Sequence, residues 1–202
     1  EEIRERISLK KGLTRPELAV LLSHSKISTF QMLLNSDVPE DTFLAEDLER
    51  YFPTALSPRF KGFMANHRLR REIIATHVTN SMINRVGPGV TLRMNELTGA
   101  HPAETARAYA AAREVFRLRE LWREIEGLDN VVISRIQKEL MHETRILLEQ
   151  AILWLLRYRP RPIDIASTVS EFRDAIDQLR RGFPRVLAAS NRLVQKRRVR
   201  RY

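Results

Sequence analysis

The sequence predicts an all-α protein, an irregular helical bundle that contains a long antiparallel helical hairpin at about residues 102–126 and 130–158. Three observations lead to this prediction. Only seven of the 202 residues are glycine, the alternation of apolar and polar residues that marks strands is absent, and apolar residues recur at intervals of three and four. That spacing places apolar side chains along one side of a helix.

The first helix is predicted from about Arg15 to Leu34, because the segment LTRPEL carries a helix start signal. Thr14 can cap the third amide of this helix while Glu17 reaches back to the Thr14 amide. Pro16 falls in the first turn, where a missing N–H donor breaks no helical hydrogen bond. The helix should therefore begin directly after Thr14.

Further start and stop signals divide the next part of the chain into short helices. Serine and proline begin two of them, and glycine or proline ends each one. The predicted elements run from about Pro39 to Tyr51, from Ser57 as a cap onward, from His67 to the glycine at 87, and from about Val90 to Leu97. Pro102 with Glu104 then starts the first arm of the hairpin.

Two apolar stripes predict the arms of the hairpin, and Gly127 to Asn130 separates them. The first stripe consists of Ala108, Ala112, Val115, Leu118, Trp122 and Ile125, and the second of Ile133, Ile136, Leu140, Thr144, Leu147, Ala151, Trp154 and Tyr158. Spacing close to 3.5 favours packing like that of a coiled coil, with both tryptophans in the core. The second arm, with about 28 residues, would be roughly 42 Å long, which suggests a bracket or spacer.

The prolines of the segment Arg159 to Asp164 end the second arm, since the residue before a proline is pushed out of the helical region. Two shorter helices are expected after it, near Ser167 to Arg181 and from Pro184 onward. We expect one helical domain over residues 1–188 and a basic end, helical or disordered, over residues 189–202.

The net charge of +10 by itself suggests nucleic-acid binding, but the positions of the charges along the chain weaken that interpretation. The last twelve residues contain six basic and no acidic side chains, which leaves 10 − 6 = +4 for the other 190 residues. The body of the protein is therefore only mildly basic. This distribution favours a solvated or partner-facing structural role for the basic end over nucleic-acid binding.

Several classes of protein are disfavoured by what the sequence lacks. It has no cysteine, so disulfides and thiolate chemistry are excluded, and an intracellular, cytoplasmic location is expected. No stretch has the 18 or so apolar residues of a membrane span, and the charged start EEIRERISLKKG differs from a signal peptide. An acidic start without methionine suggests a fragment, although tag removal or processing would produce the same start.

The segment from His67 to Gly87 carries the candidate binding residues. On a helical wheel, Asn80 falls inside an apolar arc, so its amide has to find hydrogen-bonding partners. Interhelical hydrogen bonding is the leading interpretation, and an anion or effector pocket lined by Arg70, Arg71 and His77 is the alternative. The candidate set for such an effector site or polar network is Arg70, Arg71, His77, Asn80 and Asn84.

No catalytic, cofactor-binding or metal-binding residues are predicted in this chain. His67 and His77 would lie about 15 Å apart along one helix, too far to share a metal ion, and the other histidines have no histidine one turn away. The segment Gly87-Pro88-Gly89 lacks the third glycine and the preceding strand of a dinucleotide fingerprint, and the sequence has no phosphate-binding loop.

Six stretches in a consistent order resemble one known family. They are GLTRPELAVLLSHSK, HRLRREIIAT, THVTNSMINRVG, ELTGA, AYAAAREVFRLRELWREIEGLDN and WLLRYRPRPIDI. From about Gly12 to about Ile165 the chain resembles the C-terminal region of the very large bacterial NAD-specific glutamate dehydrogenases. The resemblance implies a parent enzyme that oxidises L-glutamate to 2-oxoglutarate and ammonium while it reduces NAD.

In that family the dehydrogenase core, with its substrate-binding lysines, catalytic acid and Rossmann cofactor domain, lies upstream of the stretch TRPELAVLL. None of those residues can be carried over to this sequence. The resemblance therefore implies a non-catalytic segment that contacts the catalytic domain of its own chain, supports a homo-oligomer or transmits an effector signal, without membrane contact. The alternatives are a basic helical adaptor for an acidic protein or nucleic acid, and an enzyme with a pocket at Arg70, Arg71 and His77.

Overall fold

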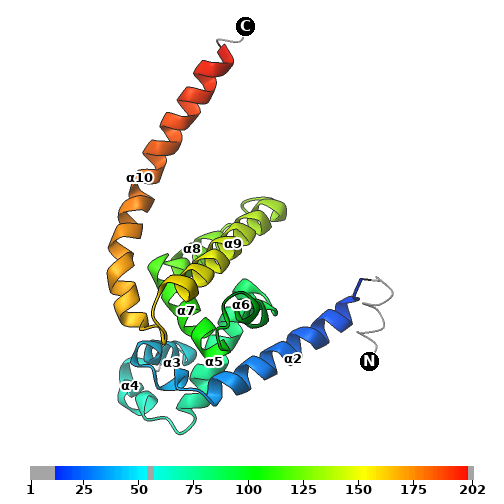
Figure 1. The fold of residues 1–202 in the computed structure, drawn as a ribbon, viewed down its shortest axis with the longest axis vertical. Coiled ribbons are helices and arrows are strands. Elements are labelled where there is room, and N and C mark those ends of the chain that lie inside the picture. The colour runs from blue at the N-terminus through cyan, green and yellow to red at the C-terminus, as the bar shows by residue number, and fades with distance from the viewer. Residues whose placement is uncertain (1–11, 54–56, 200–202) are drawn as a thin grey trace.

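The structure is a computed structural model that describes residues 12–53 and 57–199; the side chains of residues 57–59, 61 and 184–199 are not described. All regular secondary structure in these two ranges is helical, which confirms the predicted all-α class (Figure 1). No helix in the described part of the chain is both long enough and apolar enough to cross a membrane.

The elements follow the predicted order. They are α2 (Arg15–Leu34), η1 (Val38–Glu40), η2 (Thr42–Leu44), α3 (Ala45–Tyr51), α4 (Ser57–Ala65), α5 (Arg70–Val86), α6 (Val90–Thr98), α7 (Pro102–Val115), α8 (Leu118–Glu126), α9 (Ser134–Tyr158) and α10 (Ile165–Val199). The short helix expected from Pro39 is thus two 3-10 turns followed by α3.

Local capping contacts explain where several helices begin and end. At the start of α2, the backbone N–H of Thr14 donates to the Glu17 carboxylate at 2.6 Å, as the sequence predicts. At the start of α7, His101 takes the cap position, and its backbone N–H donates to Glu104 at 2.8 Å. Gly99 ends α6 in the left-handed region, with φ of 69°, which glycine adopts without steric cost.

Helix α7 is the centre of the bundle. It packs against α2, α5, α6, α8, α9 and α10. Every residue from Ala103 to Val115 except Glu104 and Glu114 is buried, as expected for a helix with neighbours on all sides. Six alanines in this stretch keep the helix thin, so that the surrounding helices can approach closely.

The first arm of the predicted hairpin differs from the expectation of one helix over residues 102–126. It consists of two helices, α7 and α8, because the chain turns at Arg117, whose φ of 49° lies in the left-handed region. The Arg117 guanidinium donates three hydrogen bonds to the Asp177 carboxylate of α10, at 2.6, 2.8 and 3.0 Å. All six residues of the first apolar stripe are buried, so the stripe continues across the break and conceals it in the sequence.

The second arm, α9, buries a different face from the predicted one. The expected core position of Trp122 is confirmed, but that of Trp154 is wrong, since its side chain is 46% exposed. Of the predicted stripe on α9, only Thr144 is fully buried and Ala151 is half-buried. The buried seam consists of Thr144, Leu148, Ile152, Leu155 and Leu156. Both faces of α9 are apolar, and the sequence alone does not show which one its neighbours cover.

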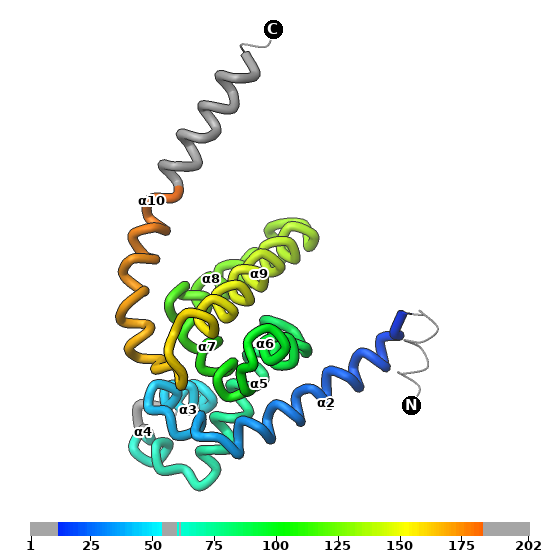
Figure 2. Tube along the Cα trace, viewed as in Figure 1, coloured from blue at the N-terminus to red at the C-terminus, as the bar shows by residue number. Residues whose placement is uncertain are grey.

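The C-terminal part of the chain is one helix rather than the predicted two. Helix α10 continues from Ile165 to Val199 through Pro184, where a break was expected. Proline removes a single N–H donor, and a helix can absorb the loss by bending. Figure 2 traces the part of α10 before Pro184, which lies beside the α7–α9 region of the bundle. The boundary predicted at residue 188 stays a prediction.

The phase of α9 can be tested with two neighbouring leucines. Leu148→Ala removes a fully buried side chain, so we expect the free energy of unfolding to fall by about 2–5 kcal/mol. Leu147→Ala removes an exposed side chain and should cost about 1 kcal/mol or less. Urea denaturation of both variants measures the difference, and equal losses would contradict the observed phase.

Candidate functional site

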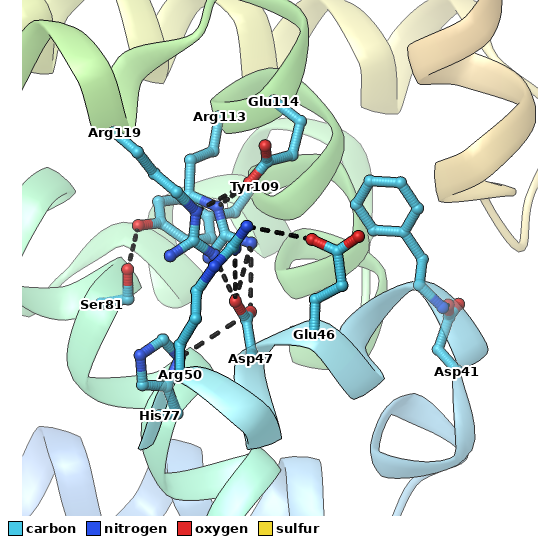
Figure 3. Close-up of polar contacts among 11 residues, drawn as sticks. Asp41, Glu46, Asp47, Arg50, His77, Ser81, Tyr109, Arg113, Glu114 and Arg119 are labelled. Atoms are coloured by element: carbon cyan, nitrogen blue, oxygen red, sulfur yellow. Dashed lines mark hydrogen bonds and ion pairs between the residues drawn. The ribbon is translucent and has the colours of Figure 1, made fainter. Parts of the chain in front are cut away.

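The described part of the chain contains a cluster of charged side chains around the buried carboxylate of Asp47 (Figure 3). Asp47 is 1% exposed and accepts a hydrogen bond from Arg113 at 3.0 Å. Arg119 pairs with the other carboxylate oxygen, and Arg50 lies 3.5 Å from it. The His77 Nδ1 atom is 3.7 Å from the carboxylate, a distance that allows an ion pair when the imidazole is protonated but not a hydrogen bond.

Four helices supply these side chains. Asp47 belongs to α3, His77 to α5, Arg113 to α7 and Arg119 to α8. Glu114, next to Arg113 on α7, accepts hydrogen bonds from the Nε atoms of Arg113 and Arg119 at 2.9 and 2.8 Å. Two carboxylates therefore hold two guanidinium groups between them, and the cluster joins helices that are far apart in sequence.

Burial and charge oppose each other at Asp47. Burial alone would raise the pKa of this carboxyl, but the contact with His77 and the charges of Arg113 and Arg119 outweigh it and hold the pKa well below its usual range. In the same way, burial acts to raise the pKa of Glu114, and the neighbouring Arg113 and Arg119 reverse the effect and lower it. Both carboxylates thus stay ionised at neutral pH.

These properties suit a structural role better than a chemical one. A general acid or base works best with a pKa near the operating pH, and Asp47 is shifted in the opposite direction. The nearby hydroxyl groups of Ser81 and Tyr109 are hydrogen-bonded to each other at 2.6 Å, and burial raises the pKa of Tyr109. In residues 12–53 and 57–199 no group of three or more acidic, histidine or cysteine side chains is arranged to hold a metal ion.

In the structure, the predicted site residues lie at different places and contact different partners. Arg70 and Arg71 lie together and both pair with Glu40, Arg70 at 3.0 Å. The Arg71 Nη2 atom also donates to the carbonyl oxygens of Leu34 and Ser36 at 2.7 and 3.2 Å. These contacts attach the start of α5 to the segment that follows α2.

The other three candidates do not join that pair. His77 is half-buried beside Asp47, Asn80 is half-buried between α2 and α5, and Asn84 is exposed. No hydrogen bond links the Asn80 amide to another residue in the described ranges. The predicted interhelical hydrogen-bond network of Asn80 stays a prediction. The unpartnered Asn80 amide also lines a small hollow between α2 and α5.

Sequence analysis missed the Asp47 cluster. The available signal was an arginine inside an alanine-rich helix, since Arg107 and Arg113 both occur in a stretch too apolar to face solvent. Arg107 is buried as well and pairs with Asp41 and, at 3.0 Å, with Asp37. The identity of the acidic partners could not be read from the sequence, because they lie about 66 residues away.

By its fold and by the Asp47 cluster, this chain is an all-helical unit in which ion pairs among the described charges around Asp47 join helices to one another. A comparison with models of known protein families identifies the family to which this helical unit belongs. The model described as "Glutamate dehydrogenase, C-terminal" matches residues 10–202. The chain belongs to this family, which confirms the resemblance found in the sequence.

Comparison with curated proteins gives the same result. The chain is 43% identical to the NAD-specific glutamate dehydrogenase of Pseudomonas aeruginosa, 39% to that of Halomonas elongata and 35% to that of Mycobacterium tuberculosis, each over 179 residues. Each match covers 89% of this chain but only 11% of the relative. The chain thus spans about a ninth of the length of these relatives and corresponds to their C-terminal region.

The buried charge of Asp47 can be tested with an isosteric replacement. Asp47→Asn leaves Arg113 and Arg119 without their shared carboxylate, so we expect the free energy of unfolding to fall by about 3–5 kcal/mol. Glu46→Gln, at the neighbouring exposed carboxylate, should cost about 1 kcal/mol or less. Urea denaturation measures both variants, and similar losses would argue against a special role for Asp47.

The lowered pKa of Asp47 also predicts a pH dependence of stability. The unfolded chain takes up this proton near the ordinary value of 3.8, whereas the folded chain resists protonation. The contribution of Asp47 is therefore complete above about pH 5 and is lost as the pH falls through 3.8 toward the folded pKa. Denaturation at a series of pH values should show a shallower acid decline for Asp47→Asn, and an unchanged decline would contradict this.

Proposed function

We propose that this chain is a non-catalytic helical segment of an NAD-dependent glutamate dehydrogenase and that it supports the rest of the enzyme through exposed apolar faces of α2 and α9. The names of the relatives support NAD as the cofactor of the parent protein. The parent reaction would convert L-glutamate, NAD and water into 2-oxoglutarate, ammonium and NADH. The role of this segment would be structural.

The observation that carries this proposal is an uncovered apolar stripe on the first half of α9. Large apolar side chains recur there every three to seven residues, and each is between 38% and 62% exposed: Ile133, Ile136, Leu140 and Leu147. Ile146 and Val131 extend the exposed apolar surface around them. A row of exposed apolar side chains of this kind on a folded domain usually marks a contact with another protein surface.

Helix α2 supports the same conclusion from a different part of the molecule. Its first half extends away from the bundle, and Leu18, Val20 and Leu21 are exposed there (Figure 1). Leu18 and Leu21 are three residues apart and lie on one side of the helix, whereas Val20 points to another side. A helix that is apolar on several sides is normally covered by neighbours.

We assign the covering surface to the remaining part of the same longer polypeptide. The 179 matched residues are only 11% of each relative, and the shared name of the relatives describes a dehydrogenase activity. That activity needs a nucleotide-binding crevice, which in dehydrogenases lies at the edge of a parallel sheet. The described residues of this chain form only helices. The catalytic domain would thus lie outside this segment and dock against it, and homo-oligomer formation stays a prediction.

The docking surface can be tested in the full-length enzyme with Ile136→Glu. The variant places a charge on the exposed stripe, so we expect the isolated 202-residue chain to keep its stability within about 1 kcal/mol. In the full-length enzyme the charge would be buried, so we expect a clear fall in melting temperature and at least a several-fold loss of dehydrogenase activity.

Gln150→Glu, which adds the same charge at another exposed position of α9, should leave both properties unchanged. An Ile136→Glu enzyme with wild-type stability and activity would contradict the docking surface. Dissociation into smaller, fully active species, measured by analytical ultracentrifugation, would assign the stripe to a second copy instead and would also contradict the proposal.

The non-catalytic role predicts that the isolated chain does not turn over glutamate. NADH formation from L-glutamate and NAD, followed by absorbance, should be at background for the 202-residue chain and readily measured for the full-length enzyme. The reason is that NAD binding requires a crevice for which the sequence has no fingerprint. Turnover by the isolated chain would refute the assignment.

A further inference from the structure

A small hollow lies between α2 and α5, and none of its lining residues belongs to the Asp47 cluster or to the exposed apolar stripe of α9. It has a volume of about 170 Å³ and is open to solvent. Its lining consists of Lys26, Ile27 and Phe30 from α2 and Thr76, Thr79 and Asn80 from α5. A single water needs only about 10–15 Å³, so the hollow can take a molecule of several heavy atoms.

The polar groups that line the hollow lack partners in the protein. Lys26, Thr76 and Asn80 form no hydrogen bond or ion pair with any other described residue. Thr79 is 2% exposed, and its hydroxyl oxygen is fully buried without a hydrogen-bonding partner. Buried polar groups normally find a partner in the protein or in ordered water. The Thr79 hydroxyl has no such partner in the protein, and the half-buried polar groups of Lys26, Thr76 and Asn80 line the same hollow and are free to bind a ligand.

The chemistry of the lining restricts what that ligand can be. One ammonium group supplies a single positive charge, and the hydroxyl groups and the amide add neutral donors. Most of the remaining lining is apolar, which suits a short hydrocarbon body better than inorganic phosphate. The volume lies below the roughly 300–1,000 Å³ of sites that bind larger cofactors or drug-sized ligands, so a nucleotide would not fit.

We propose that this hollow binds a small monocarboxylate. The Lys26 ammonium pairs with the carboxylate, the Asn80 amide and the Thr76 hydroxyl donate to its oxygens, and the hydrocarbon body rests against Phe30 and Ile27. A rotation about the Cα–Cβ bond of Thr79 exchanges the positions of its hydroxyl and methyl groups. Because helical threonines populate both rotamers, Thr79 can bring either group to the same position. The bound carboxylate joins α2 to α5. This site is separate from the proposed docking surface, because its α2 residues lie in the second half of that helix and the exposed docking residues of α2 lie in the first half.

The test is a titration of the 202-residue chain with straight-chain carboxylates from acetate to hexanoate, followed by the backbone amide resonances of Thr76 and Asn80. We expect saturable shifts, with an affinity that rises by up to about fourfold for each added methylene until the apolar wall is covered. Propionamide, which has the same shape as propionate without the charge, should give no saturable shift. Sodium chloride at matched ionic strength controls for screening.

Three variants identify the site. Lys26→Gln and Asn80→Ala should each weaken carboxylate binding by about tenfold or more, whereas Lys138→Gln on the exposed surface of α9 should have no effect. Ile27→Ser, at an exposed position, should remove most of the dependence on chain length. The inference is overturned if carboxylates do not bind saturably, if phosphate binds equally well, or if Lys26→Gln binds like the wild type.

Discussion

Helix α7 has neighbours on all sides, and this one constraint determines much of the rest of the structure. A buried polar side chain of α7 has to find its partner inside the bundle, because water does not reach it. Its two buried arginines do so on the same segment: Arg107 pairs with Asp41, and Arg113 pairs with Asp47. Both pairs join residues 66 positions apart, so the segment from η2 to α3 is aligned with α7 in the same chain direction.

These ion pairs determine where α3 lies more than they stabilise the fold. The removal of two charges from water costs free energy that their attraction often only offsets. An apolar contact of the same size could hold α3 in place, but it would tolerate a shift along α7. The Asp47 carboxylate accepts only one arrangement of Arg113 and Arg119, so a shift would leave buried charges unpaired. The cluster therefore opposes a shift of the seven-residue α3 along α7.

Features controlled by neighbouring residues could be predicted from the sequence, and features controlled by distant ones could not. The start of α2 at Thr14 and the end of α6 at Gly99 depend on residues within one turn, and both were predicted. The break at Arg117 depends on Asp177, and the buried face of α9 depends on the positions of α7 and α8. At the candidate site, the sequence indicated Arg70, Arg71 and His77 as polar groups but not their acidic partners.

The elements that extend from the bundle are held by specific polar contacts as well as by apolar packing. Ion pairs hold the first half of α10, among them the pair between Arg117 and Asp177 and the pair between Arg159 and Glu171. Ser25 donates a hydrogen bond of 2.6 Å from α2 to the carbonyl oxygen of Pro88. Such contacts are directional, so they resist rotation of a helix about its own axis, which apolar packing alone tolerates. For α2 this suits the proposed supporting role, because its exposed apolar side chains can dock in one orientation only if the helix does not turn about its own axis.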